Sequence, residues 1–120
     1  MAKDDYDVIA YKILVYYYGI LKRAYVFQNE ALNKLISKAD IADEYFSDIL
    51  RMMQGEGLIT GAVFTRIWGN EYLLSNDTSE ISITPAGISY LKGNSRMRQI
   101  GEKLKEIPGL VESLIRIVKP

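Results

Sequence analysis

The apolar and polar positions between residues 41 and 61 predict a helix that stops at glycines and leads into a strand. Apolar side chains recur there at helical spacing, at Phe46, Ile49, Leu50 and Met53. Asp43 and Glu44 precede this stripe, in the turn where the helix dipole favours negative charge. Gly55 and Gly57 end the pattern, because glycine accepts the left-handed backbone of a helix C-cap. An extended run begins at Leu58.

The segment before this helix predicts two more helices joined by a short turn. The first covers about residues 5–24 and is apolar on almost every side, so more than one neighbour must cover it. We expect it at the centre of the fold or in a subunit interface, with Tyr17 and Tyr18 as candidate dimer contacts. The second covers residues 30–37, and the turn at residues 38–41 then gives a helix-turn-helix layout.

Short strands and turns are predicted between residues 58 and 83. Residues 58–67 are rich in β-branched and aromatic side chains and predict one strand. Gly69 and Asn70 favour a hairpin turn, after which residues 72–74 return as a short strand. A polar loop follows, and the alternation at residues 81–83 is typical of a half-buried strand.

The last third of the chain predicts helices with clear start signals. Thr84 and Pro85 suit the N-cap and the first position of a helix that ends near Gly93. Ser95 is expected to cap the next helix, whose apolar stripe is Met97, Ile100, Leu104 and Ile107. Pro108 and Gly109 break that helix. A last amphipathic helix follows and supplies three more candidate dimer contacts, Leu110, Leu114 and Val118.

This order of elements predicts an α+β, mainly helical fold, a winged helix-turn-helix with extra C-terminal helices. Residues 1–92 are expected to form the winged-helix core. Residues 93–120 are expected to form a C-terminal helical extension, which either belongs to the same domain or serves dimerisation. A chain of 120 residues is long enough to bury one self-supporting core.

Two stretches of the sequence resemble a known family. They are E-Y-F-S-D-I-L-R-M-M-Q-G-E-G-L-I-T-G, from Glu44, and I-T-P-A-G-I-S-Y-L-K-G-N, from Ile83. Their combination is similar to the YjcQ-like proteins, small winged-helix proteins of bacteria and their phages, over about residues 40–107. The resemblance implies a fold, and it supplies neither an activity nor site residues. This chain differs in its longer N-terminal helix, longer wing and extra helix after Pro108.

The chain contains no cysteine and no histidine, which limits its chemistry. The usual zinc sites and Ser-His or Cys-His nucleophiles are excluded. Asp40, Asp43 and Glu44 are expected to serve a helix start rather than acid–base catalysis or a cation site. We therefore expect no enzyme and no cofactor. The apolar run at residues 8–21 is shorter than the about 20 residues that span a membrane, and no secretory pattern precedes it, so the cytoplasm is expected.

The formal net charge is zero, but the charges are unevenly spread. Residues 40–80 carry two basic and eight acidic side chains, which gives −6, whereas residues 1–39 carry +2 and residues 81–120 carry +4. Cations for a phosphate backbone would have to come from Lys34 and Lys38, or from a C-terminal stripe. That stripe consists of Arg96, Arg98, Lys103 and Lys105, for which a solvated helix face is the other interpretation.

Fold analogy makes DNA binding and transcription regulation the first hypothesis, with the third helix in the major groove. The residues expected to face outward on the third helix and the wing are Glu44, Ser47, Asp48, Arg51, Arg66 and Trp68. Trp68 either touches a partner or packs beneath the wing. Because the segment is acidic, the alternative is a protein-interaction module of the same fold, of phage or prophage type, that does not bind DNA. A homodimer without membrane association is expected in both cases.

Overall fold

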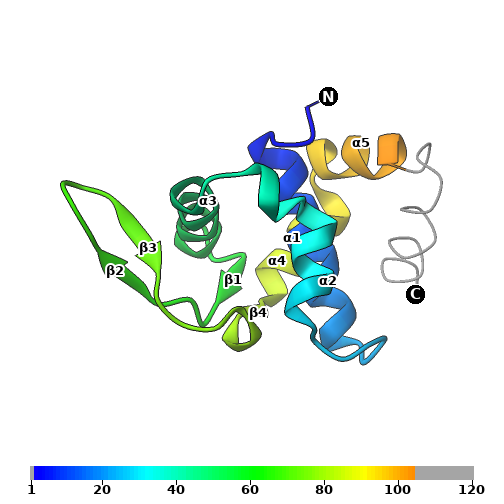
Figure 1. The fold of residues 1–120 in the computed structure, drawn as a ribbon. Coiled ribbons are helices and arrows are strands. Elements are labelled where there is room, and N and C mark those ends of the chain that lie inside the picture. The colour runs from blue at the N-terminus through cyan, green and yellow to red at the C-terminus, as the bar shows by residue number, and fades with distance from the viewer. Residues whose placement is uncertain (1, 105–120) are drawn as a thin grey trace.

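A computed structural model describes residues 2–104 as five α-helices and two small two-stranded sheets (Figure 1). The helices are α1 (Tyr6–Leu21), α2 (Asn29–Ile36), α3 (Asp43–Gly55), α4 (Pro85–Gly93) and α5 (Ser95–Leu104). The strands are β1 (Ile59–Thr60), β2 (Phe64–Arg66), β3 (Tyr72–Leu74) and β4 (Ser82–Ile83). Single 3-10 turns cover Lys38–Asp40 and Thr78–Glu80. The predicted α+β, mainly helical class is confirmed.

Helix α1 forms the centre of the core. Every residue from 8 to 19 is buried, and the helix contacts α2, α3, α4, α5 and β4. The central position predicted from its all-round apolar surface is confirmed. The helix is shorter than the predicted residues 5–24, because the chain turns at Arg23, whose backbone has a φ of 62°.

Two tyrosines of α1 are interior groups, so the prediction that Tyr17 and Tyr18 contact a second subunit is wrong. They are only 3% and 8% exposed. The Tyr17 hydroxyl donates a hydrogen bond to the Thr78 carbonyl at 2.7 Å. The amino groups of Lys22 and Lys92 lie 5.3 Å and 5.1 Å from the centroid of the Tyr18 ring. Both side chains are therefore buried by contacts within the same chain.

Helix α3 keeps the apolar stripe predicted for it. The buried residues that form the stripe of α3 include Phe46, Ile49, Leu50 and Met53. Gly57 lies just past the end of α3 with a φ of 79°, which confirms the glycine stop. Asp43 and Glu44 lie in the first turn of α3 as predicted, but Ala42 occupies the N-cap position. Asp40 pairs with Lys3 at 2.8 Å, and Asp43 pairs with Lys38 at 2.6 Å.

The single strand predicted over residues 58–67 is wrong, because Gly61 divides it. Gly61 has a φ of 95°, and a Cβ atom there would overlap the carbonyl oxygen of Glu80. Strand β1 therefore pairs antiparallel with β4, while β2 pairs antiparallel with β3, with Thr65 opposite Leu73. The predicted turn at Gly69 and Asn70 and the short return strand are confirmed.

Helix α4 begins as its start signals predict. The Thr84 hydroxyl accepts a hydrogen bond from the Gly87 N–H at 2.9 Å, and Pro85 lies in the first turn. Gly87 lets the helix approach β1 closely, since a Cβ atom there would overlap the Leu58 carbonyl oxygen. The first turn of α4 is therefore tied to the chain that leaves α3.

Helix α5 packs on α1 and α4 through its buried side chains, which are Met97, Ile100 and Leu104. Asn94, rather than the predicted Ser95, caps it. The Asn94 side-chain oxygen accepts hydrogen bonds from the N–H groups of Arg96 and Met97, at 2.9 Å and 3.1 Å. The predicted last helix lies outside the described residues.

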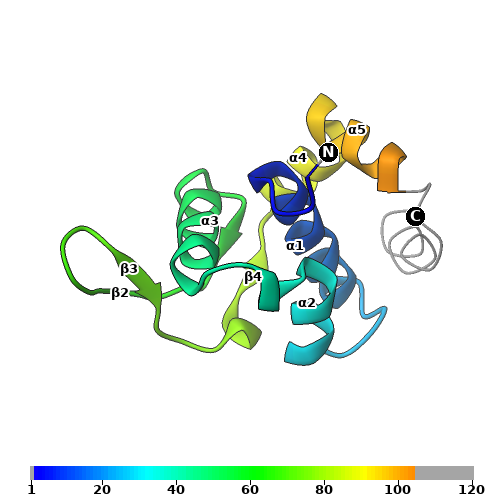
Figure 2. The same ribbon diagram turned by 45° about the horizontal axis from the view of Figure 1, so that its top comes forward.

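The β2–β3 hairpin and helix α5 lie at opposite ends of the molecule (Figures 1 and 2). Helix α3 lies between the hairpin and the helices that surround α1, and it contacts both β3 and α1. Helix α3 therefore links the hairpin to the helices around α1.

Candidate functional site

The β2–β3 hairpin packs along α3, and two polar side chains of the helix hold it there. The Ser47 hydroxyl oxygen accepts a hydrogen bond from the Leu74 N–H at 3.0 Å. The Gln54 amide binds both backbone groups of Ala62: its Nε2 donates to the carbonyl at 2.9 Å, and its Oε1 accepts from the N–H at 2.9 Å. These three hydrogen bonds fix the position of the hairpin relative to the helix.

Ser47 is not an outward residue of α3, so its prediction is wrong. It is 2% exposed, because β3 covers this side of the helix. Helical spacing placed Ser47 between Glu44 and Asp48, but it carries no information about a strand that folds back onto the same side. A serine that binds water and one that binds a neighbouring strand have the same local sequence pattern.

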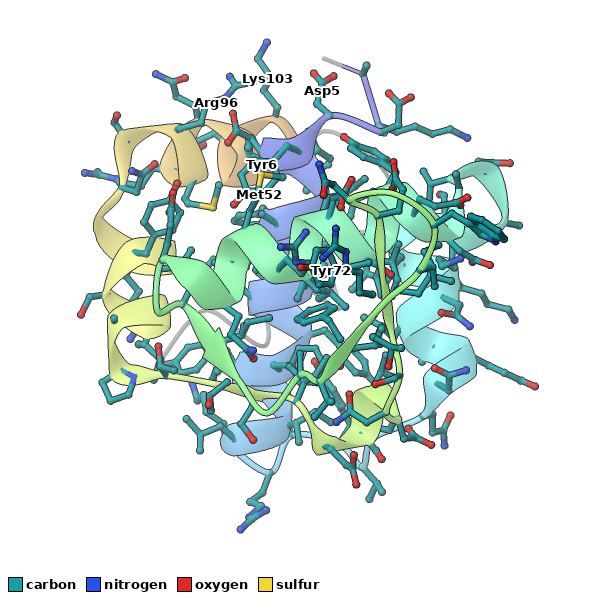
Figure 3. The ribbon with its side chains drawn as sticks, turned by 90° about the vertical axis from the view of Figure 1, so that its left-hand side faces the viewer. Asp5, Tyr6, Met52, Tyr72, Arg96 and Lys103 are labelled. Atoms are coloured by element: carbon teal, nitrogen blue, oxygen red, sulfur yellow. The ribbon has the colours of Figure 1, made fainter. Side chains whose placement is uncertain are left out.

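The Arg51 guanidinium is engaged by groups of the protein itself. Its central carbon lies 3.8 Å from the centroid of the Tyr72 ring, within cation–π range. One of its nitrogens lies 4.0 Å from the Asp48 carboxylate. Figure 3 looks at this surface from outside and shows Tyr72 of β3 against α3. Arg51 thus links the helix to the hairpin as well as carrying a charge.

The exposed row on α3 consists of Glu44, Asp48 and Met52. These residues are four apart, so they lie along one face of the helix. The Asp48 side chain is 46% exposed and Met52 is 48% exposed. The row presents two carboxylates and a thioether, and the cation beside it is the already engaged Arg51. Glu44, Asp48 and Arg51 therefore face solvent as predicted, and the surface that they make is acidic.

Acidic residues near the N-terminus lie beside α3, which the sequence analysis did not foresee. The Tyr45 hydroxyl of α3 donates a hydrogen bond to the Asp4 carbonyl at 2.6 Å. Burial, followed by the charges of Asp4 and Asp5, raises the pKa of Tyr45. Figure 3 shows Asp5 next to the start of α1 on the same side of the molecule as Met52. The acidic character of α3 thus continues across the N-terminal segment.

The charge of Glu56, just after the other end of α3, also acts on the N-terminal segment. Burial first, then the charge of Glu56, the Tyr90 hydroxyl and the charge of Asp7, raise the pKa of Tyr6 to about 12. Arg96 offsets part of this negative charge, since its Nε donates a hydrogen bond to the Asp7 carboxylate at 3.1 Å. The run D-D-Y-D at residues 4–7 is the signal in the sequence that could have indicated this acidic surface.

Trp68 stands at the tip of the hairpin and is 92% exposed. Of the two interpretations left open by the sequence, packing beneath the hairpin is therefore wrong. Arg66 stabilises the turn: its Nε donates to the Gly69 carbonyl at 3.0 Å and a terminal nitrogen donates to the Asn70 side chain at 3.1 Å. The tip presents an indole on a turn that is held by hydrogen bonds.

A groove of about 300 Å³ lies between α2, α3 and β3. Its lining residues are Asn29, Asn33, Lys38, Asp43, Phe46, Ser47, Leu73, Leu74 and Thr78. Lys38 hydrogen-bonds Asp43, which lowers the pKa of that carboxyl, and its amino group lies 5.4 Å from the centroid of the Phe46 ring. Lys38 thus makes its contacts inside the groove, whereas Lys34, one turn earlier in α2, is exposed to solvent.

The C-terminal basic residues are far from the hairpin. Arg98 and Lys103 are exposed on α5, and Arg96 is paired with Asp7. Figure 3 shows Arg96 and Lys103 together at one edge of the molecule, away from Tyr72. The structure does not bring this stripe together with Arg51 and Arg66. The remaining candidates, Lys105, Leu110, Leu114 and Val118, lie outside the described residues.

Residues 2–104 contain no group of three or more acidic side chains placed to hold a metal ion. Among the helices of this part of the chain, none is long and apolar enough to cross a membrane.

Comparison with known proteins identifies the family. Neither the curated proteins nor the solved structures contain a match to the chain. The family model described as "YjcQ protein" matches residues 11–110. The match begins within α1 and extends past the end of α5, and it includes the glycine-terminated α3 and the Thr84 cap on which the resemblance depended. The chain therefore belongs to the YjcQ family.

Proposed function

We propose that this chain is a winged-helix interaction module whose exposed face of α3, with the N-terminal carboxylates beside it, binds a basic region of another protein. The order of elements supports the winged-helix assignment. Three helices precede a strand, a hairpin packed on the third helix and a strand that pairs back with the first. The observation that carries the functional proposal is the exposed row of α3, which is formed by Glu44, Asp48 and Met52.

DNA binding, the function expected from helix order, is the competing hypothesis. Affinity for DNA depends largely on lysine and arginine side chains that neutralise phosphates. In this structure Arg51 stacks on Tyr72, and Lys38 pairs with Asp43. The carboxylates of Glu44 and Asp48 would instead face the major groove of the DNA and repel its phosphates. The free cations of α5 lie at the opposite end of the molecule and cannot join α3 on one duplex face.

A basic partner fits the charges that surround α3. The N-terminal carboxylates approach α3 near Tyr45, so the acidic surface extends beyond the helix itself. Met52 adds a flexible apolar contact at the C-terminal end of the exposed row, a role that methionine often has at binding surfaces. Complementary charge of this kind speeds association and excludes partners of the same sign, such as nucleic acid.

The proposal is tested by fluorescence anisotropy with two labelled probes, a duplex DNA and a short arginine- and lysine-rich peptide. We expect the wild type to bind the peptide and to leave the duplex unbound at micromolar protein and about 50 mM salt, where non-specific DNA affinity is strong. Peptide affinity should fall as salt rises, because the contacts are exposed. Duplex binding under these conditions, or no peptide binding, would refute the proposal.

A matched pair of substitutions locates the binding surface. Glu44→Gln and Glu30→Gln each remove one exposed glutamate from the first turn of a helix, α3 and α2 respectively. We expect Glu44→Gln to weaken peptide binding about two- to fivefold, the usual effect of one exposed charge, and Glu30→Gln to leave it unchanged. Equal effects of both substitutions would show that overall charge, and not α3, attracts the peptide.

A further inference from the structure

The exposed Trp68 is the least protected large apolar side chain among the described residues. At 92% exposure, its indole is almost wholly in water. Arg66 holds the surrounding turn by hydrogen bonds to Gly69 and Asn70. The turn therefore loses little conformational entropy when the indole binds a partner. Tryptophan on a pre-formed turn is typical of the anchor residue of an interface.

The same chain carries a groove that suits such an anchor. The groove between α2, α3 and β3 is lined by the apolar residues Phe46, Leu73 and Leu74 together with polar groups. The side chains of Asn29 and Asn33 line its α2 side and are suited to an indole N–H, which needs an acceptor when buried. Its volume of about 300 Å³ is at the low end for ligand pockets, a size that suits one large side chain better than a cofactor.

The charges beside the anchor and beside the groove are opposite. Arg66, next to the tip, donates hydrogen bonds to neutral acceptors and forms no ion pair within residues 2–104. Asp43, at the edge of the groove, keeps 78% of its side chain exposed although it pairs with Lys38. An indole that enters the groove would bring the Arg66 guanidinium toward this carboxylate.

The anchor and the groove belong to two ends of one hairpin. Leu73 and Leu74 of β3 line the groove, and Trp68 lies at the turn that precedes β3. A two-fold axis near the middle of the hairpin would therefore bring the tip of each copy to the groove of the other. Both contacts would form at once, and the assembly would close as a dimer.

We infer that two copies of this chain form a symmetric dimer in which Trp68 of each copy fills the groove between α2, α3 and β3 of the other. The groove uses Asp43, Phe46 and Ser47 of α3, whereas the exposed row uses other residues of that helix. Dimerisation therefore leaves the proposed partner surface open, and the two proposals can fail separately.

The dimer is tested by sedimentation velocity from micromolar to several hundred micromolar protein. We expect a monomer–dimer equilibrium with no larger species. Trp68→Ala should weaken it by about 100-fold or more, because each dimer loses two anchors. Val26→Ala is the matched control: it truncates another exposed apolar side chain, 82% exposed, and should leave the equilibrium unchanged. A wild type that stays monomeric, a dimer that survives Trp68→Ala, or an open-ended assembly would overturn the inference.

Fluorescence gives a second, independent measurement, since Trp68 is the only tryptophan. We expect its emission to move to shorter wavelength as the wild type is concentrated. Asn33→Phe obstructs the groove but keeps the anchor, so this variant should keep the emission of an exposed indole at all concentrations. Excess Trp68→Ala protein, which is non-fluorescent at this position and has an open groove, should then shift the emission of Asn33→Phe. No shift on mixing would contradict insertion into the groove.

Discussion

Replacement of Gly87 by alanine tests the packing that joins α4 to the rest of the fold. A Cβ atom at this position would overlap the Leu58 carbonyl oxygen and would lie 2.9 Å from Ile83 Cγ1 and 3.1 Å from the Leu58 carbonyl carbon. The Leu58 oxygen cannot move aside easily, because it is backbone and accepts a hydrogen bond from the Thr84 N–H at 3.1 Å. Relief therefore requires a shift of α4 against β1.

The expected cost follows from two opposing effects. Overpacking a well-packed site costs about 1–3 kcal/mol and at times more. Alanine returns up to about 1 kcal/mol through its higher helix propensity, less near a helix terminus. We therefore expect Gly87→Ala to lower the free energy of unfolding by about 1–3 kcal/mol, measured by urea denaturation followed by circular dichroism. The slope of the unfolding free energy against urea should not change.

Gly55→Ala is the control for this experiment. Gly55 is also helical, in the last turn of α3, but nothing lies within 4 Å of a Cβ atom there. This substitution should be neutral or stabilising by up to about 1 kcal/mol. If Gly87→Ala proved as harmless as Gly55→Ala, the close approach of α4 to β1 would be refuted.

Three further predictions concern the hairpin, the cap of α4 and alkaline pH. Ser47→Ala leaves the Leu74 N–H without its acceptor, so we expect a loss of about 1–3 kcal/mol and faster hydrogen exchange at the Leu74 amide; unchanged exchange would contradict this. Thr84→Val removes the cap of α4 and should cost about 1–2 kcal/mol in urea, whereas Thr84→Ser should cost little. Burial is the main reason that the pKa of Tyr6 is raised to about 12, and it also raises the pKa of Tyr17. Because the folded state favours the neutral phenols, this stability is complete below the unfolded pKa of about 10 and is lost as pH rises through the folded values. A melting temperature that stays constant to pH 12 would disprove it.

The elements that the sequence predicted correctly are those with local signals. The α3 stripe, its stop at Gly57, the turn at Gly69 and the Thr84 cap each depend on residues within one or two turns of each other. Propensity and capping act at this range, so a single sequence contains the information. The central position of α1 was also predictable, because a helix that is apolar on every side must be surrounded.

The features that the sequence did not predict depend on contacts between distant residues. Ser47 is buried by Leu74, 27 residues later in the chain, and Asp4 meets Tyr45, 41 residues later. The division at Gly61 depends on the Glu80 carbonyl, which a Cβ atom would strike. The sequence pattern of residues 58–67 contains no information about that distant carbonyl. The many β-forming residues there therefore predicted one continuous strand in spite of the glycine. The groove likewise exists only after α2, α3 and β3 have come together.

The positive φ of Gly61 divides the β-structure into an inner strand pair that belongs to the core and an outer hairpin that is largely exposed. The inner pair carries Ile59 and Ile83, both buried, and cannot change without disturbing the interior. The outer hairpin ends in a turn that is almost all in solvent from Trp68 onward to Glu71. Mutation and changes of loop length between Arg66 and Tyr72 are therefore nearly neutral for folding. Substitutions at this turn can therefore change what the hairpin contacts without disturbing the interior.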